Sequence, residues 1–181
     1  MNHYQDHQYL EPILRFLDEI NLPYQLQPIN GKMFLPGIMI RKGTIIIDKE
    51  KLKFPGDILH EAGHIAVAPA DVRSKLTSPV NAQLDFDAAT HEMMTLAWSY
   101  AAALESGTPL DVLFHAEGYK GQGDNISYGF QSGQYIGLPM LQYIGLPMLQ
   151  YLGMACDANH AAKNNTQPFP VMIHWLRPKL D

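Results

Sequence analysis

The chain has 181 residues, a length that suits one domain with its own hydrophobic core. Hydrophobic residues make up 46% of the sequence and charged residues 17%, which is typical of a folded globular protein and excludes an intrinsically disordered chain. The formal net charge is −5 and no basic run occurs, so neither a nucleic-acid partner nor an acidic membrane surface is predicted.

The N-terminal part of the chain predicts one helix followed by a small sheet. Apolar residues recur at helical spacing over 6–20, and Pro12 is compatible with that helix if it lies in the first turn. A short strand is expected within 22–29. Residues 37–50 predict a β-hairpin, in which two β-branched runs are joined at Arg41-Lys42-Gly43.

Two further helices are expected in the middle of the chain. The first begins at Asp57, a residue type favoured at helix N-caps, and ends before Pro69. Residues 70–84 contain proline and several polar side chains, so they are predicted to form a loop. The second helix covers 85–107 and is rich in alanine, with aspartate at its start and Gly107 at its end.

The C-terminal part of the chain gives weaker patterns. Thr108 and Pro109 predict a helix start, with the threonine as cap and the proline at the first helical position. The glycine-rich segment 117–129 is predicted to be a mobile, exposed loop, with a lid over the cleft as the alternative. The tail, 170–178, is expected to add a final strand.

An octapeptide, QYIGLPML, occurs twice in succession at 134–141 and 142–149, and a diverged copy follows at 150–157. Eight residues do not match the helical period, and each identical copy carries a proline, so one straight helix is not predicted. Two identical units are too few and too short for a solenoid. We interpret the repeat as a local duplication, and the apolar stretch 134–154 could cover the core or form a dimer surface.

The compartment is predicted from the N-terminus and from cysteine usage. The first residues, MNHYQDHQYLEP, have neither the basic start nor the apolar run of a secretory signal. No apolar stretch has the length needed to span a bilayer, so no membrane partner is predicted. The single cysteine, Cys156, excludes an intramolecular disulfide and favours a reducing compartment. We therefore expect a cytoplasmic protein.

The order of these elements predicts an α+β fold in one domain that spans residues 1–181. A small, mainly antiparallel sheet is expected to pack on the helix from Asp57 and on the alanine-rich helix. The core of the domain is placed at about 22–107. Residues 108–181 form an extension that adds further helices and carries the duplication at 134–149.

The helix that starts at Asp57 contains the run His60-Glu61-Ala62-Gly63-His64. Residues four apart lie on one helix face, so both imidazoles can reach one metal ion. Glu61 cannot lie directly beneath that ion, but its carboxylate can reach an activated water from the side. The alternative is a pair of ordinary core histidines, although two unpaired histidines in an apolar helix would be costly to bury.

A catalytic zinc site usually has three protein ligands, so the two histidines need a third group. The best candidate is Glu92. The other face of the alanine-rich helix is apolar and is expected to be buried, so the helix lies in the core and the Glu92 carboxylate would need a partner. His91, Asp85 and Asp87 are the alternatives for this position. Glu92 could also be an ordinary acidic residue in the first helical turn, where the helix dipole favours negative charge.

Two segments, GTIIIDKEKLKFPGDILHEAGHIAVAP and HEMMTLAWSYAAAL, together resemble the ImmA/IrrE family of small, gluzincin-type metallopeptidases. Members pair a strand that ends in a polar turn with a His-Glu-x-Gly-His helix, and a second helix supplies a glutamate followed by small and aromatic residues. The resemblance covers about residues 40–104. It implies a minimal zincin-like fold with Zn²⁺ as cofactor, with Glu61 as catalytic base and with the zinc ligands His60, His64 and Glu92.

The chain also departs from that family. Members commonly carry a helix-turn-helix module that binds DNA, or act on a repressor, and no such module is visible in this sequence. The segment ADVRSKLTSPVNAQLDFD and the sequence past residue 107 differ from typical members. The fold and the metal site therefore transfer from the resemblance better than a substrate or a regulatory role.

These features predict a zinc-dependent peptidase, a hydrolase whose partner is a peptide or protein substrate. Glu61 would take a proton from water and pass it to the leaving amine. A further donor should stabilise the oxyanion, and the candidates are His115, Tyr119 and Tyr100. The strand at 44–48 could bind an extended substrate at the sheet edge, or it could be an ordinary core strand.

The alternative function is a zinc-binding regulatory or protein-interaction module with little or no turnover. The intact Glu61 argues against it, because a pseudo-enzyme has no need to retain the base. A structural domain without metal is the third hypothesis. Asp57 and Asp71 flank the histidine-bearing helix and could orient a ligand histidine, although capping is the favoured role of Asp57.

Overall fold

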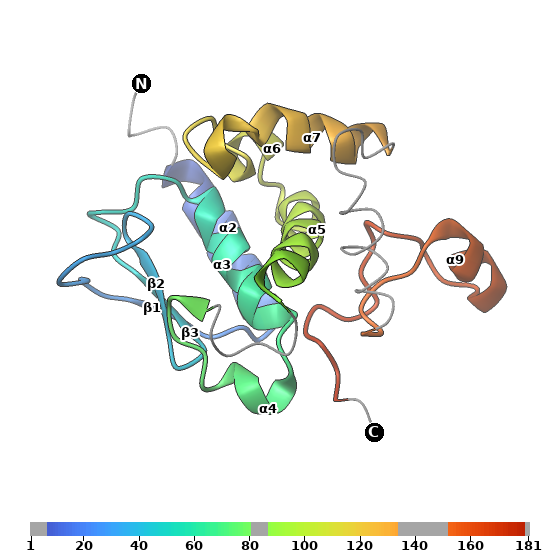
Figure 1. Ribbon diagram of the computed structural model, residues 1–181, viewed down its shortest axis with the longest axis horizontal. Coiled ribbons are helices and arrows are strands. Elements are labelled where there is room, and N and C mark those ends of the chain that lie inside the picture. Colours follow the sequence, from blue (N-terminus) through green and yellow to red (C-terminus); the bar gives the residue numbers. More distant parts are fainter. Residues whose placement is uncertain (1–6, 81–86, 134–151, 180–181) are drawn as a thin grey trace.

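The computed structural model describes residues 7–80, 87–133 and 152–179, in which helices and one small sheet form an α+β fold (Figure 1). The predicted α+β class is therefore confirmed. The helices in these residues are α2 (Leu10–Glu19), α3 (Gly56–Ala66), α4 (Ala70–Arg73), α5 (Ala88–Ser106), α6 (Leu110–Leu113), α7 (Gly123–Ser132) and α9 (Ala158–Asn164), with the 3-10 turns η1 (His7–Tyr9) and η3 (Tyr119–Gly121).

The sheet has the strand order β1-β3-β2, formed by β1 (Tyr24–Leu26), β3 (Thr44–Ile47) and β2 (Ile38–Arg41). β2 and β3 are antiparallel, and Lys42 and Gly43 between them have φ angles of 50° and 71°. This confirms the predicted hairpin, whose two-residue turn needs positive φ at both positions. β1 pairs with β3 in parallel, so the sheet is mixed and not mainly antiparallel as predicted. The reason is that β3 enters between the two earlier strands.

The central position of β3 overturns the prediction that residues 44–48 could accept an extended substrate as an added strand. β1 and β2 already occupy both sides of this strand. The outer edge of β2 is covered as well, because the Ile40 N–H donates to Ser78 Oγ at 2.9 Å and the Ile40 carbonyl accepts from the Ser78 N–H at 3.0 Å. Residues 44–48 therefore serve as a core strand.

α2 and α5 form where the periodicity predicts helices. Pro12 lies in the first turn of α2, where its missing N–H removes no helical hydrogen bond. The carboxylate of Asp87 caps α5 and accepts from the N–H groups of Ala89 and Thr90. Gly107 closes the helix in the left-handed conformation, with φ 69°. Both ends of α5 therefore follow from local residue chemistry.

α3 begins earlier than predicted. Pro55 occupies the N-cap position, so Asp57 lies in the first turn and does not cap the helix. Gly56, the first residue of the helix, lets α6 pack very closely against it. A Cβ on Gly56 would come 2.1 Å from the carbonyl oxygen of Val112, which only a glycine avoids.

The glycine-rich segment 117–129 is not the predicted loop. It contains η3 and most of α7. Ile126 and Phe130, which are four residues apart, bury one face of α7. This helical spacing was present in the sequence, but the surrounding glycines and the short length of the segment obscured it.

The prediction of a strand at 170–178 is also wrong, because these residues form turns and irregular backbone. They pack on the helices instead. The indole N–H of Trp98 donates to the carbonyl of Trp175 at 2.8 Å, and the Arg177 N–H donates to the carbonyl of Ala66 at 2.9 Å. The C-terminal segment therefore contacts both α5 and the end of α3.

The predicted loop at 70–84 contains the short helix α4, and Thr108 does not cap α6, because Pro109 occupies that position. The duplication at 134–149 lies outside the described residues. The division into a core at 22–107 and an extension stays a prediction.

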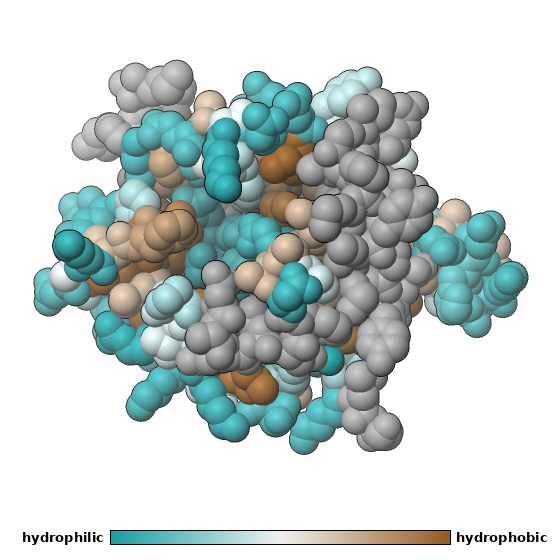
Figure 2. All heavy atoms as spheres, viewed as in Figure 1, coloured by the Kyte–Doolittle hydropathy of each residue, from teal (hydrophilic) through white to brown (hydrophobic). Residues whose placement is uncertain are grey.

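α3 occupies the centre of the fold, where it contacts β2, β3, α5 and α6. All of its residues except His60 are buried. Figure 2 shows hydrophilic side chains over much of one face of the molecule, with a smaller hydrophobic area on the side where the sheet lies. In the part of the chain that is described, no helix is both long and apolar enough to cross a membrane.

Candidate metal centre

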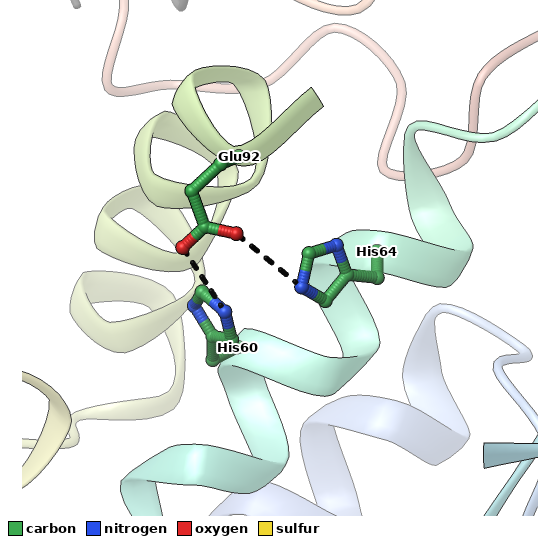
Figure 3. A group of neighbouring side chains, drawn as sticks. All are labelled: His60, His64 and Glu92. Carbon is green, nitrogen blue, oxygen red and sulfur yellow. Dashed lines mark ion pairs between the residues drawn. The ribbon is translucent and has the colours of Figure 1, made fainter. Parts of the chain in front are cut away.

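α3 and α5 bring the side chains of His60, His64 and Glu92 together (Figure 3). Nε2 of His60 lies 3.4 Å from Oε1 of Glu92, and Nε2 of His64 lies 3.6 Å from Oε2. Both separations are longer than a good N–H···O hydrogen bond, which measures about 2.7–3.2 Å. The three donor atoms lie within 4.8 Å of one another, so this group could hold a metal ion.

The centre is buried on the histidine side and open on the glutamate side. The side chains of His60 and His64 are 13% and 10% exposed, whereas that of Glu92 is 39% exposed. Burial lowers the pKa of His64 well below its usual value, and the neighbouring His60 and His91 lower it further. His64 is therefore neutral at pH 7, which is the form that binds a metal.

Glu61 follows His60 in α3 and is 9% exposed. Burial raises the pKa of its carboxyl to about 8, and the carboxylates of Asp57 and Glu92 raise it as well. A divalent cation held by the three donors would lower this pKa again, because a nearby positive charge favours the ionised carboxylate. Binding of a metal at this group would therefore favour release of the proton from Glu61.

The second ring nitrogen of His64 faces α5. Nδ1 of His64 lies 3.2 Å from Nδ1 of His91 and 3.2 Å from Oγ1 of Thr95. His91, considered as a ligand from the sequence, therefore lies behind His64 and outside the three-residue group. The contact with Thr95 was not predicted. Its position three residues after Glu92, on the same face of α5, could have indicated it.

Asp57 has a different partner from those predicted. Its Oδ1 lies 3.0 Å from Nε2 of His115, and both side chains are largely buried. The His115 ring stacks on Phe54, with ring centroids 3.7 Å apart and planes at 9°. Asp57 therefore holds His115 rather than a ligand histidine. Asp71 is exposed in α4, and no hydrogen bond or ion pair joins it to a described histidine.

Tyr119 lies at the edge of the same centre. Its ring meets that of His60 at 81°, with centroids 5.7 Å apart. Tyr119 and Lys120 have φ angles of 52° and 55°, in the left-handed region that non-glycine residues seldom adopt. Such strained residues are concentrated at functional sites. The Tyr119 hydroxyl is buried and has no hydrogen-bond partner among the described residues. Burial and the neighbouring carboxylates raise its pKa well above the usual value, so it stays a neutral donor.

The remaining candidates from the sequence lie elsewhere. Tyr100 is buried and stacks on Phe130, with centroids 4.6 Å apart, so its ring belongs to the core. Asp87 caps α5, and Asp85 lies outside the described residues.

No protein-family model, curated protein or solved structure gives a significant match to this chain. The candidate site therefore rests on its own geometry.

Proposed function

We propose that this protein is a zinc-dependent peptidase of the ImmA/IrrE type, with a zincin-like core. The observation that carries the proposal is the spacing of the donor atoms. Zinc in tetrahedral coordination, with bonds of about 2.0–2.2 Å to nitrogen and oxygen, keeps its ligand atoms about 3.3–3.6 Å apart. The Glu92 carboxylate meets this spacing with a different oxygen toward each histidine, Oε1 at 3.4 Å from His60 Nε2 and Oε2 at 3.6 Å from His64 Nε2. One donor atom from each of the three residues lies within 4.8 Å of the others. Two histidines and one glutamate also form a common ligand set of catalytic zinc.

Glu61 is the proposed general base. Zinc bound at this centre would polarise the scissile carbonyl and lower the pKa of a water molecule. Glu61, next to His60, would take the proton of the attacking water and deliver it to the leaving amine. Its buried position supports this role, because a carboxylate in such surroundings accepts a proton readily.

Tyr119 is the proposed oxyanion donor. Its neutral hydroxyl has no partner in the described part of the chain, and its ring packs edge-on against that of His60. Such a donor stabilises the negative charge that develops on the carbonyl oxygen. His115 is the second candidate, but its Nε2 is already paired with Asp57, and its Nδ1 is buried. We therefore favour Tyr119.

Zinc affinity, measured by competition with a chromophoric chelator, tests the metal centre. The wild-type protein should bind one zinc ion per chain, and His60→Ala and Glu92→Gln should bind it much more weakly. His160→Ala and Glu105→Gln are matched controls, because both residues are exposed and lie outside the centre. A wild-type protein without stoichiometric zinc, or His60→Ala that binds zinc normally, would contradict the proposal.

Hydrolysis of an unstructured peptide library by the zinc-loaded protein tests turnover. Glu61→Gln should lower the rate by about 10²–10⁴-fold, because it removes the base and keeps the shape of the side chain. Zinc should remain bound in this variant. Glu50→Gln, at an exposed position, should cleave like wild type. Zinc binding without any cleavage by wild type would favour the regulatory module instead.

A further inference from the structure

His64 and His91 face each other through the same ring nitrogen. The two Nδ1 atoms are 3.2 Å apart, the ring planes differ by 5° and the ring centroids are 5.2 Å apart. Because the nitrogens are much closer together than the centroids, the rings lie side by side with Nδ1 facing Nδ1. This arrangement fits an N–H···N hydrogen bond between two imidazoles.

Such a hydrogen bond needs one donor and one acceptor, so only one of the two Nδ1 atoms carries a proton. A metal on Nε2 of His64 uses the lone pair of that nitrogen, and the neutral ring then carries its proton on Nδ1. His64 is therefore the donor when a metal is bound, and His91 is the acceptor. His91 in turn must carry its own proton on Nε2.

α5 holds the His64 ring from both sides. Glu92 faces Nε2 of His64 at 3.6 Å, and the preceding residue, His91, faces Nδ1. Thr95, one turn further along, places its hydroxyl oxygen 3.2 Å from the same Nδ1. His91 and Thr95 are 1% and 0% exposed, so water does not compete for these contacts. The orientation of His64 therefore depends on one turn of α5.

We propose that His91 is a positioning residue, which holds His64 in the orientation and tautomer that a metal requires. This inference rests on the proposed metal centre. Metal-binding histidines commonly donate to a carboxylate, a backbone carbonyl or water. A neutral imidazole in that position adds no negative charge beside the ion. The ion therefore keeps more of its positive charge for polarising a substrate carbonyl.

Two substitutions of His91 separate hydrogen bonding from packing. His91→Phe keeps a flat ring but offers no acceptor, whereas His91→Asn offers the oxygen of its amide. Zinc affinity, measured by chelator competition, should fall about 10–100-fold in His91→Phe and recover in part in His91→Asn. Thr95→Val, which removes the other contact of His64 Nδ1, should have the smaller effect. Circular dichroism and thermal unfolding with excess chelator check that each variant is folded.

Nitrogen-15 NMR of the imidazoles in the zinc-loaded wild type gives a second readout that needs no substitution. We expect His64 to be protonated on Nδ1, and His91 to be protonated on Nε2 and unprotonated on Nδ1. A proton on Nδ1 of His91 would overturn the inference. Equal zinc affinity of wild type and His91→Phe would overturn this inference alone. A wild-type protein that binds no zinc would overturn it together with the proposed function.

Discussion

Gly63 of α3 lies directly against Thr95 of α5, so closely that a Cβ on Gly63 would come 2.9 Å from Thr95 Cγ2. Ser99 Oγ would be 3.1 Å away. The glycine between the two motif histidines therefore lets the helices approach each other at this point. The same approach brings Glu92 within reach of His60 and His64. The glycine of the motif thus has a structural role that is separate from metal binding.

Gly63→Ala should lower the free energy of unfolding by about 1–3 kcal/mol, because the new methyl group overpacks the helix contact. The gain of about 1 kcal/mol in helix propensity should not offset this. The double variant Gly63→Ala/Thr95→Ser removes the methyl group that the new Cβ meets, so it should recover part of the loss. Urea unfolding with excess chelator measures both. A Gly63→Ala protein as stable as wild type would show that the helices can separate freely.

Arg73 ties the end of α3 to the C-terminal segment. It donates from Nε to the carbonyl of Ile65 at 3.2 Å, and from Nη2 to the carbonyls of Ala68 and Arg177 at 3.2 Å and 2.9 Å. Carbonyls at a helix end lack helical partners. Arg73→Ala should therefore cost about 1–3 kcal/mol of stability.

Arg73→Lys should rescue little of that loss, because a single ammonium group cannot reach all three carbonyls. Lys75→Ala, at an exposed position of the same segment, should change the stability by less than about 0.5 kcal/mol. Thermal and urea unfolding of the four proteins give the comparison. Full rescue by lysine would mean that charge alone matters at this position.

The stability of the chelated protein should depend on pH through Glu61. Its pKa rises from the ordinary 4.5 to about 8 on folding, so between these values the folded chain holds a proton that the unfolded chain releases. The contribution of Glu61 to stability is therefore fully present below about pH 4.5 and falls as the pH rises toward 8. The slope should be at most about 1.4 kcal/mol per pH unit.

The difference in unfolding free energy between wild type and Glu61→Gln isolates this contribution. The lowered pKa of His64 acts in the opposite direction, because its contribution to stability grows as the pH rises toward the ordinary pKa of histidine. His64 is present in both proteins, so this contribution cancels in the difference. The difference should shrink when zinc is added, since the cation favours the ionised Glu61. A difference that does not change between pH 5 and pH 8 would contradict the raised pKa.

Asp57→Ala should destabilise the protein by about 1–3 kcal/mol, because it leaves a buried nitrogen of His115 without its partner. Asp57→Asn keeps an oxygen acceptor and should lose less. Asp111→Ala, an exposed carboxylate in α6, is the matched control and should be close to neutral. Unfolding curves at pH 7 give the free energies of unfolding. Equal values for Asp57→Ala and Asp111→Ala would show that the contact between Asp57 and His115 does not stabilise the fold.

Local patterns predicted several elements correctly. The periodicity of α2, the turn at Lys42-Gly43 and the two ends of α5 all depend on residues within a few positions of one another. The placement of His60 and His64 on one face also follows from helix geometry alone. These features were accessible because the interactions that create them are short-range in the sequence.

Long-range contacts account for the failures. α7 starts at Gly123, where a Cβ would come 2.0 Å from the carbonyl oxygen of Phe114. This glycine, which indicated a loop in the sequence, is therefore needed for close packing at the start of a helix. The residues at 170–178 do not form a strand, since their polar groups bond to the helices, as the carbonyl of Trp175 does to Trp98. The mixed sheet likewise depends on the insertion of β3 between strands that precede it.

The same distinction applies to the candidate metal centre. The spacing of two histidines in one helix was readable from the residues, and so was Glu92 as the favoured third group. The path of α5 across α3, which Gly63 permits, is what brings Glu92 to both Nε2 atoms and leaves His91 at Nδ1 of His64. The partner of Asp57, likewise, is His115 from a distant part of the chain. Helical spacing orders side chains within one element, whereas their meeting across elements depends on how those elements pack.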